Sequence, residues 1–190
     1  MSLKIKRQSD TRVVHACTHN LADIPNGVTV CSNELVPGTP LKEGSAIAPG
    51  SDGLYHVIKT ASVAEAVTAT GKTVKVEKGS HFKAGDAVMF GGVAAKINRV
   101  DRDGLTYDTI TLAAALGALA KGDVLTLAAA AASADAQPAY KAKALTGDHY
   151  DVKELENHLV SAVTIGQFKE SVIPPITDAI KEQVRGIQFI

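Results

Sequence analysis

Short stretches in which apolar and polar residues alternate dominate the middle of the chain. Thr73–Glu77 alternates over five residues, which is typical of a strand with one buried face. Further short strands are predicted at Ala87–Phe90, Val93–Val100, Thr106–Leu112 and Val124–Leu127. The Asp101-Arg102-Asp103-Gly104 stretch separates two of them as a hairpin turn. Strands this short, joined by glycine-containing turns, predict a small antiparallel β-barrel or sandwich over residues 54–137.

Two segments inside this region resemble each other. Phe82–Val88 and Leu119–Leu125 each contain an apolar residue, a lysine-containing pair, Gly-Asp and the apolar start of a strand. We interpret them as two turns that use the same chemistry rather than as a functional repeat. A repeated turn at equivalent corners favours a pseudo-symmetric barrel.

The first 53 residues are rich in turn formers and poor in long periodic runs. Pro25-Asn26-Gly27 is a turn, because proline fixes φ and Asn-Gly accepts positive φ. Only Arg12–Thr18 and Val28–Cys31 are strand candidates. We therefore expect residues 1–53 to form an extended, loop-rich arm. The alanine-rich residues 128–137 are expected to be a connector, because an isolated segment of this length is a marginal helix in water.

The tail, residues 138–190, is predicted to form a helix–strand segment that packs on the barrel or sandwich. Val152–Leu159 is a candidate helix, and a strand is expected within Val160–Phe168. A short helix at Asp178–Val184 has Thr177 as its N-cap and Gly186 as its C′ residue. The apolar last four residues, 187–190, are expected to complete a sheet or to enter a partner. The expected fold class is thus mainly β, with short helices and an N-terminal arm.

Composition narrows the classes of function. The 190 residues suit one domain, or one domain with an arm. Lys+Arg and Asp+Glu are 20 each, and this neutral balance predicts no nucleic-acid partner. No apolar stretch is long enough to span a bilayer. The charged Lys4-Ile5-Lys6-Arg7 start lacks a following apolar region, so we expect no signal peptide and synthesis in a cytoplasm.

Four residues near the start are candidates for metal chemistry. His15, Cys17 and His19 lie two residues apart and share one face of an ideal strand, and Cys31 is a possible fourth ligand for zinc. Their spacing matches no common zinc module, so a buried cysteine flanked by polar contacts is the preferred interpretation. Cys17 is also disfavoured as a nucleophile, because neighbouring histidines on one strand rarely form the needed hydrogen bond.

The other candidate sites have structural explanations. Gly91-Gly92 lacks the frame of a phosphate-binding loop and is interpreted as a strand kink or bulge. Asp101, Asp103 and Asp108 do not follow the EF-hand spacing for calcium. Three histidines of the core and tail, His81, His149 and His158, are scattered, and no nucleophile elbow is present. We therefore expect a protein that is not an enzyme, with no catalytic, cofactor-binding or metal-binding residues.

Four segments of the second half carry a resemblance to a known family. The Ser161–Glu170 stretch resembles strands of head decoration and head fibre proteins of tailed bacteriophages and prophages. The 174–181 and 186–190 stretches are similar to the closing helix and strand of such proteins, and Tyr107–Leu112 through Lys121–Leu125 is similar to their β domains. Gly166 departs from the pattern, which prefers a basic residue there.

The resemblance implies a structural role in a virion. It implies a homo-oligomer, with a trimer favoured, that binds the major capsid protein lattice on the capsid surface after synthesis in the bacterial cytoplasm. Many weak contacts, multiplied by symmetry, then cement the capsid. A flat decoration and the base of a projecting fibre are both compatible with this role.

Two other functions remain open from the sequence. A glycan-binding surface module needs a groove with exposed aromatic residues or an acidic calcium site, and only 4% of the residues are aromatic. A small metal-binding protein centred on His15, Cys17 and His19 is the less favoured alternative.

Overall fold

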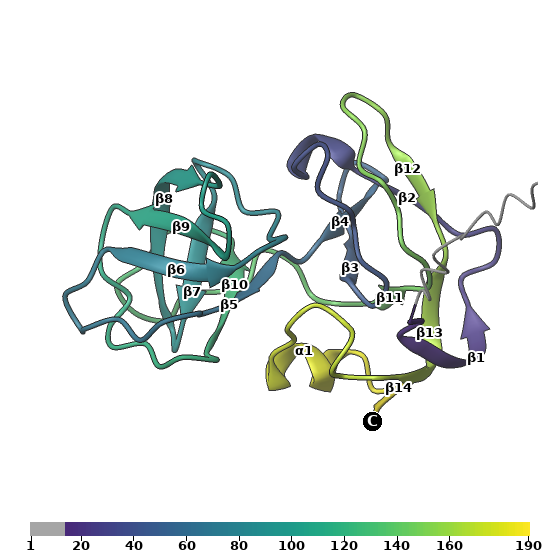
Figure 1. Ribbon diagram of the computed structural model, residues 1–190. Helices are drawn as coiled ribbons and strands as arrows, with labels where there is room; N and C mark the ends of the chain where they lie inside the picture. Colours follow the sequence, from purple (N-terminus) through teal and green to yellow (C-terminus); the bar gives the residue numbers. More distant parts are fainter. Residues whose placement is uncertain (1–13) are drawn as a thin grey trace, which may run out of the picture.

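The computed structural model describes residues 14–190, which form two β lobes (Figure 1). We call residues 59–138 the barrel lobe, and residues 14–58 with 139–190 the sheet lobe. The barrel lobe is thus an insertion in the sheet lobe. The expected fold class is confirmed: the protein is mainly β, built from two curled, largely antiparallel sheets with little helix.

The barrel lobe contains six strands: β5 (Thr60–Ser62), β6 (Thr73–Glu77), β7 (Ala87–Phe90), β8 (Val93–Asp101), β9 (Tyr107–Leu112) and β10 (Val124–Ala128). They pair in the order β5-β10-β7-β8-β9-β6, and an antiparallel bridge from Val63 to Val76 joins the two ends of the sheet. The sheet therefore closes, and its apolar side chains fill one core. Phe82 is completely buried there although it lies in a loop.

The repeated turns occupy equivalent corners of this barrel. In one turn the Asp86 carboxylate accepts a hydrogen bond from the Lys83 amide, and in the other Asp123 accepts from Ala120. The glycines before these aspartates have φ of 97° and 93°. Exchanging β5 with β8, β6 with β9 and β7 with β10 reproduces every strand pairing of the closed sheet. The sequence echo thus reflects a two-fold pseudo-symmetry.

The sheet lobe contains β1 (Cys17–Asp23), β2 (Val28–Val30), β3 (Ala46–Pro49), β4 (Tyr55–Val57), β11 (Ala144–Thr146), β12 (His158–Val160), β13 (Ala162–Phe168) and β14 (Ile187–Phe189), with a 3₁₀ turn at Ser32–Glu34. The sheet order is β1-β13-β11-β3-β4-β2-β12, and β14 adds to β13 in parallel. Two apolar clusters line its interior.

One long ribbon curls this sheet. β12 and β13 are separated only by Ser161, yet they lie near opposite ends of the strand order. β13 pairs antiparallel with β1, and β12 pairs antiparallel with β2. The Ile24 amide continues the ladder between them by donating to the Ala162 carbonyl at 2.9 Å. Residues 17–30 supply β1 and β2, and residues 158–168 supply β12 and β13. Because these two stretches contribute the strands at both ends of the order, the sheet must bend back on itself.

The structure corrects the expected organisation of the two flanks. Residues 14–53 form β1, β2 and β3 of the sheet lobe instead of an extended arm, while the earlier part of the expected arm, with the Lys4–Arg7 start, lies outside the described residues. The tail does not pack on the barrel as a separate segment, because β11, β12 and β13 share a sheet with these N-terminal strands. The turn formers at 25–27 only separate β1 from β2.

The tail differs from its prediction in two details. Residues 152–157 form a loop followed by β12, because Val152 and Val160 are buried in the sheet lobe while the residues between them are charged or exposed. The helix α1 (Asp178–Gln183) begins as predicted, with the Thr177 side chain accepting from the Ile180 amide. Gly186 is not a left-handed C′ residue: a Cβ there would lie 2.3 Å from the Thr164 carbonyl oxygen of β13.

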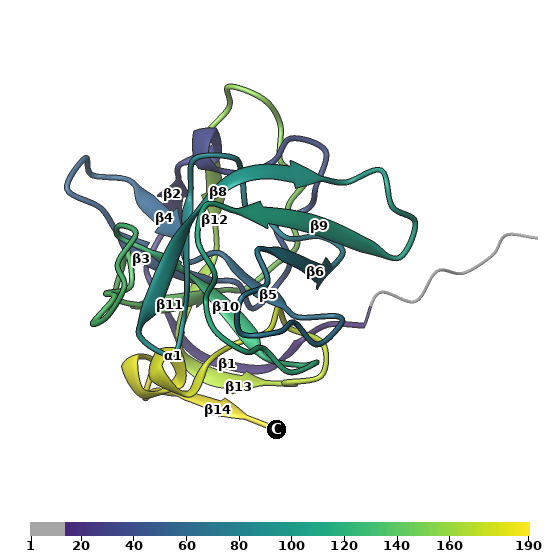
Figure 2. The same ribbon diagram turned by 90° about the vertical axis from the view of Figure 1, so that its left-hand side faces the viewer.

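The last residues complete the sheet lobe. β14 pairs with β13 beside α1, and the C-terminus lies next to them (Figure 2). In the part of the chain that the structure describes, no helix has the length and apolar character to cross a membrane.

The pseudo-symmetric turns give a paired prediction. Alanine at Gly85 or at Gly122 must adopt the left-handed conformation, while the space around both positions is open. Each substitution should therefore lower the free energy of unfolding by about 1 kcal/mol. Urea denaturation measures the effect, and Lys121→Ala, an exposed residue of the same turn, should have almost none. A neutral result for either glycine contradicts the equivalence of the two turns.

Candidate functional site

Charged side chains are concentrated where the barrel lobe leaves the sheet lobe. Lys59 lies just before β5 and is only 3% exposed. Its Nζ is 2.7 Å from Oδ2 of Asp86, and the same oxygen accepts a hydrogen bond from the Lys83 amide. A buried lysine needs such a partner, because removing an unpaired charge from water is costly. This pair fixes the start of the barrel.

A second group of polar side chains surrounds His56 of β4. Nδ1 of His56 is 3.0 Å from the Glu34 carboxylate, and Nε2 is 3.1 Å from Asp52. The Tyr140 ring stacks on the imidazole, with centroids 4.7 Å apart. The Tyr140 hydroxyl also donates to Glu34 at 3.3 Å. Because Tyr140 lies where the chain returns from the barrel lobe, this cluster holds that crossing to the sheet lobe.

The surroundings of His56 favour its charged form. Burial alone lowers the pKa of a histidine, but the two carboxylates outweigh burial here and raise the pKa of His56 above its usual value. The same contact with His56 lowers the pKa of Asp52. Burial, followed by the charge of Glu34, raises the pKa of Tyr140 to about 12. The two carboxylates therefore stabilise the protonated form of the imidazole that lies between them.

His81 links the two lobes by hydrogen bonds, and unlike His56 its surroundings favour the uncharged form. Its Nδ1 accepts a hydrogen bond from the Val36 amide at 3.2 Å, and Nε2 lies 3.3 Å from the Pro40 carbonyl. Burial lowers the pKa of His81 to about 4, and the neighbouring Lys59 and Arg102 charges act in the same direction. The imidazole is therefore neutral at pH 7. Lys83 adds a further link by donating to the Asn33 carbonyl at 2.9 Å.

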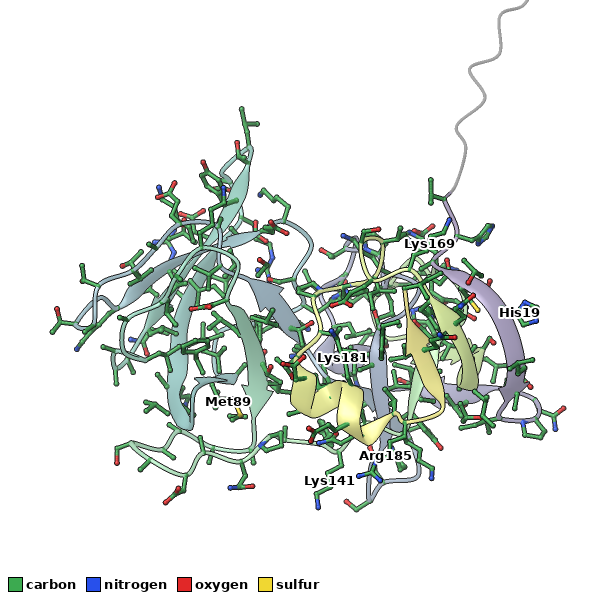
Figure 3. The ribbon with its side chains drawn as sticks, turned by 90° about the horizontal axis from the view of Figure 1, so that it is seen from below. His19, Met89, Lys141, Lys169, Lys181 and Arg185 are labelled. Atoms are coloured by element: carbon green, nitrogen blue, oxygen red, sulfur yellow. The ribbon has the colours of Figure 1, made fainter. Side chains whose placement is uncertain are left out.

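Two cavities flank the junction, and Ile58 and Ile180 line both of them. The first, of about 210 Å³, contains several polar residues, among them Lys42, Ser80 and His81. The second, of about 240 Å³, is mostly apolar and lies between the barrel lobe and α1. Viewed from below, α1 lies between the two lobes, with Met89 of the apolar cavity on the barrel side (Figure 3). Residues of both lobes and of α1 therefore line the junction on both sides.

The structure does not bring the candidate metal ligands together. Cys17 pairs with Phe168 of β13, whereas Cys31 follows β2 near the other end of the strand order. A register shift between Cys17 and His19 interrupts the expected shared face. Among residues 14–190, no group of three or more His, Cys, Asp or Glu side chains is arranged to hold a metal ion. Burial and the Glu43 carboxylate raise the pKa of Cys17, which disfavours its thiolate.

The other candidate motifs are structural. Gly91 and Gly92 form the two-residue turn of the β7–β8 hairpin, with φ of 56° and 87°, so the expected kink or bulge is wrong. The Asp101 side chain accepts from the Asp103 amide within the predicted hairpin turn. Asp108, in contrast, is buried inside the barrel lobe and lies 2.8 Å from Lys78. His149 and His158 lie outside both junction clusters.

Sequence reasoning missed the junction residues. Glu34, Tyr140 and the Asp52–His56 stretch come from three segments. Asp52 and His56 are only four residues apart, but no local spacing signals that Glu34 and Tyr140 join them. Lys59 did give a signal, since it follows the apolar Val57-Ile58 pair and lies in a short strand-like stretch. All eight aromatic residues are buried or half-buried, so none forms an exposed stacking platform.

Comparisons with protein-family models, with curated proteins and with solved structures found no match to this chain.

The two junction histidines predict opposite pH effects. Because the pKa of His56 is raised on folding, its stabilisation is complete below pH 6.5 and is lost as the pH rises through its folded pKa. Because the pKa of His81 is lowered to about 4, unfolding takes up a proton between pH 6.5 and 4, and stability falls as the pH falls in that window. The free energy of unfolding should therefore be greatest near pH 6.5.

The variant His56→Gln tests this assignment in urea titrations from pH 5 to 9. It should remove the loss of stability above pH 6.5, whereas His149→Gln, at an exposed position away from the junction, should keep the wild-type profile. If the profile of His56→Gln is unchanged, a titrating group other than His56 causes the loss of stability above pH 6.5.

Proposed function

We propose that this chain is a non-enzymatic structural protein of a tailed-phage or prophage head, which decorates or cements the capsid through protein–protein contacts. It self-associates and binds the lattice of the major capsid protein on the capsid surface, after synthesis in the bacterial cytoplasm.

One observation carries this proposal. The three tail segments that resemble head decoration and head fibre proteins fold together as one unit: β13, α1 and β14. β14 pairs with β13 over three residues, and Ile180 of α1 packs in the same apolar cluster as Phe168 of β13 and Ile187 of β14. If the resemblance fell on separate surface segments, those segments would not contact one another in this way. The fourth similar stretch, β9 through β10, lies within one closed barrel.

The distribution of exposed apolar side chains supports the same function. Leu105 is 99% exposed at the tip of the β8–β9 hairpin, and Leu155 is 86% exposed in the loop before β12. Leu155 also has φ of 61°, an unfavourable conformation for leucine. Leu21 of β1 is 70% exposed. Large apolar side chains at separate extremities suit a protein that contacts several neighbours.

The polar contacts between the two lobes also support a structural role. Three side-chain hydrogen bonds cross from the barrel lobe to the sheet lobe: His81 binds the Val36 amide and the Pro40 carbonyl, and Lys83 donates to the Asn33 carbonyl. They hold the two lobes in one orientation. A cementing protein needs this rigidity, because each copy must present two contact surfaces at a fixed spacing. Symmetry then multiplies weak contacts into high total stability.

The proposal predicts where the protein is found and what it does there. Virions from cells that carry this gene, purified on density gradients, should contain the chain in a fixed ratio to the major capsid protein, measured by quantitative mass spectrometry. Added to heads that lack it, the purified protein should bind to saturation and raise the temperature at which the heads release DNA.

An unrelated protein of similar size is the control for non-specific binding to heads. Absence of the chain from purified virions, together with no saturable binding to heads, contradicts the proposed function.

A further inference from the structure

Three strands of the sheet lobe have an edge without a neighbouring strand among residues 14–190: β1, β12 and β14. β12 and β14 are three residues long, and a charged loop precedes β12. β1 is seven residues long and contains no lysine, arginine or proline. Proteins commonly protect free edges with short strands, charges, proline or β-bulges, because an unprotected edge is a template for another strand. β1 has register shifts against β13 and ends in Asp23, but it is the longest of the three edges and offers the most backbone to a further strand.

The edge of β1 is held firmly in place. The Glu43 carboxylate, on a residue only 8% exposed, accepts hydrogen bonds from the Ala16 and Cys17 amides at 2.8 and 2.9 Å. On its inner side β1 pairs with β13. Gly166 of β13 permits this approach, since a Cβ there would lie 2.5 Å from the His19 carbonyl oxygen. The departure of Gly166 from the family pattern therefore has a structural reason.

Exposed apolar side chains surround this edge. Of the seven large hydrophobic residues that are exposed in the described chain, four lie on β1, β13 or next to β1 and β14: Val14, Leu21, Ile165 and Ile190. Four consecutive residues of β1, Thr18 to Leu21, are exposed. The strand lies on the side of the sheet lobe away from the barrel lobe (Figure 1), and His19 points outward from it (Figure 3).

We propose that β1 of one copy pairs antiparallel with β1 of a second copy, so that the sheet continues across a two-fold axis. The charges of the strand favour this occupant. His15 precedes β1, and Asp23 is its last residue. Antiparallel pairing about His19 brings the Asp23 end of each strand near the His15 end of the other copy, with individual partners displaced by the register shifts of β1. It thus adds a carboxylate near a histidine whose Nδ1 already lies 3.5 Å from Glu43.

This inference deepens the proposed function, because it names the surface used for self-association. A two-fold contact gives an even number of copies and so departs from the trimer that the resemblance favours. The barrel lobes then lie at the two far ends of the dimer, where they are free to contact other subunits.

Light scattering of the purified full chain tests the pairing. The wild type should have twice the 19.7 kDa mass of one chain at micromolar concentration. Leu21→Lys places a charge on the edge and should return the mass to that of one chain. Leu105→Lys makes the same change at a more exposed site on the barrel lobe, and it should leave the dimer intact. Thermal unfolding of each variant shows that the fold is kept.

Cysteine cross-linking tests the register independently. In a Cys17→Ser background, His19→Cys should form a disulfide-linked dimer under mild oxidation, because the two copies of residue 19 meet at the axis. Leu105→Cys in the same background should form no disulfide-linked dimer. A monomeric wild type, or a dimer that persists in Leu21→Lys, overturns the proposal.

These outcomes are separate from those of the capsid experiments. Dissociation by Leu21→Lys without any binding of the wild type to heads leaves the dimer standing and removes the proposed function. Saturable binding to heads by a monomeric wild type removes the proposed dimer and leaves the proposed binding to the capsid standing.

Discussion

The fold depends on one long-range pairing, that of residues 17–30 with residues 158–168. Hydrogen bonds in and beside this ribbon join positions 149 and 125 residues apart, between Thr18 and Gln167 and between Ser32 and Asn157. Closing such loops costs conformational entropy before any contact is gained. The inserted barrel reduces this difficulty, because its first and last strands, β5 and β10, are paired neighbours and therefore return the chain close to where it left. A barrel that closes on itself thus serves as a short connection for the sheet lobe.

The junction follows from the same arrangement. Two chain crossings join the lobes, and each is held by buried polar contacts: Lys59 with Asp86 at the first, and Tyr140 with Glu34 and His56 at the second. His81 adds neutral hydrogen bonds to the Val36 and Pro40 backbone. Buried polar groups of this kind fix a unique orientation more than they add net stability. A fixed orientation between the two lobes suits the proposed bridging of neighbouring subunits. Within residues 14–190, β1 has no second strand along its outer edge, on the side away from the barrel lobe.

The sequence by itself determined the local elements of the barrel lobe. Alternation over Thr73–Glu77, the Asp-rich hairpin turn and the two Gly-Asp turns all depend on residues within a few positions of one another, and the structure has a strand or a turn at each. The helix after Thr177 was predictable for the same reason, since an N-cap acts on the amide three residues ahead. Mainly β architecture with little helix followed from these elements.

Only the tertiary structure decided how the flanks are used. The turn formers between residues 25 and 50 indicated loops, but the intervening short strands β2 and β3 gain partners from β12 and β11, roughly a hundred or more positions away. The same long-range pairing makes β12 a strand where the local pattern favoured a helix, and it requires Gly166 and Gly186 for close backbone contacts instead of for special φ values. Most of the His56 cluster was equally invisible: Asp52 is only four residues from His56, but Glu34 and Tyr140 join them only when the sheet has closed. Local propensity specifies elements, whereas burial and strand pairing between distant segments decide which of them meet.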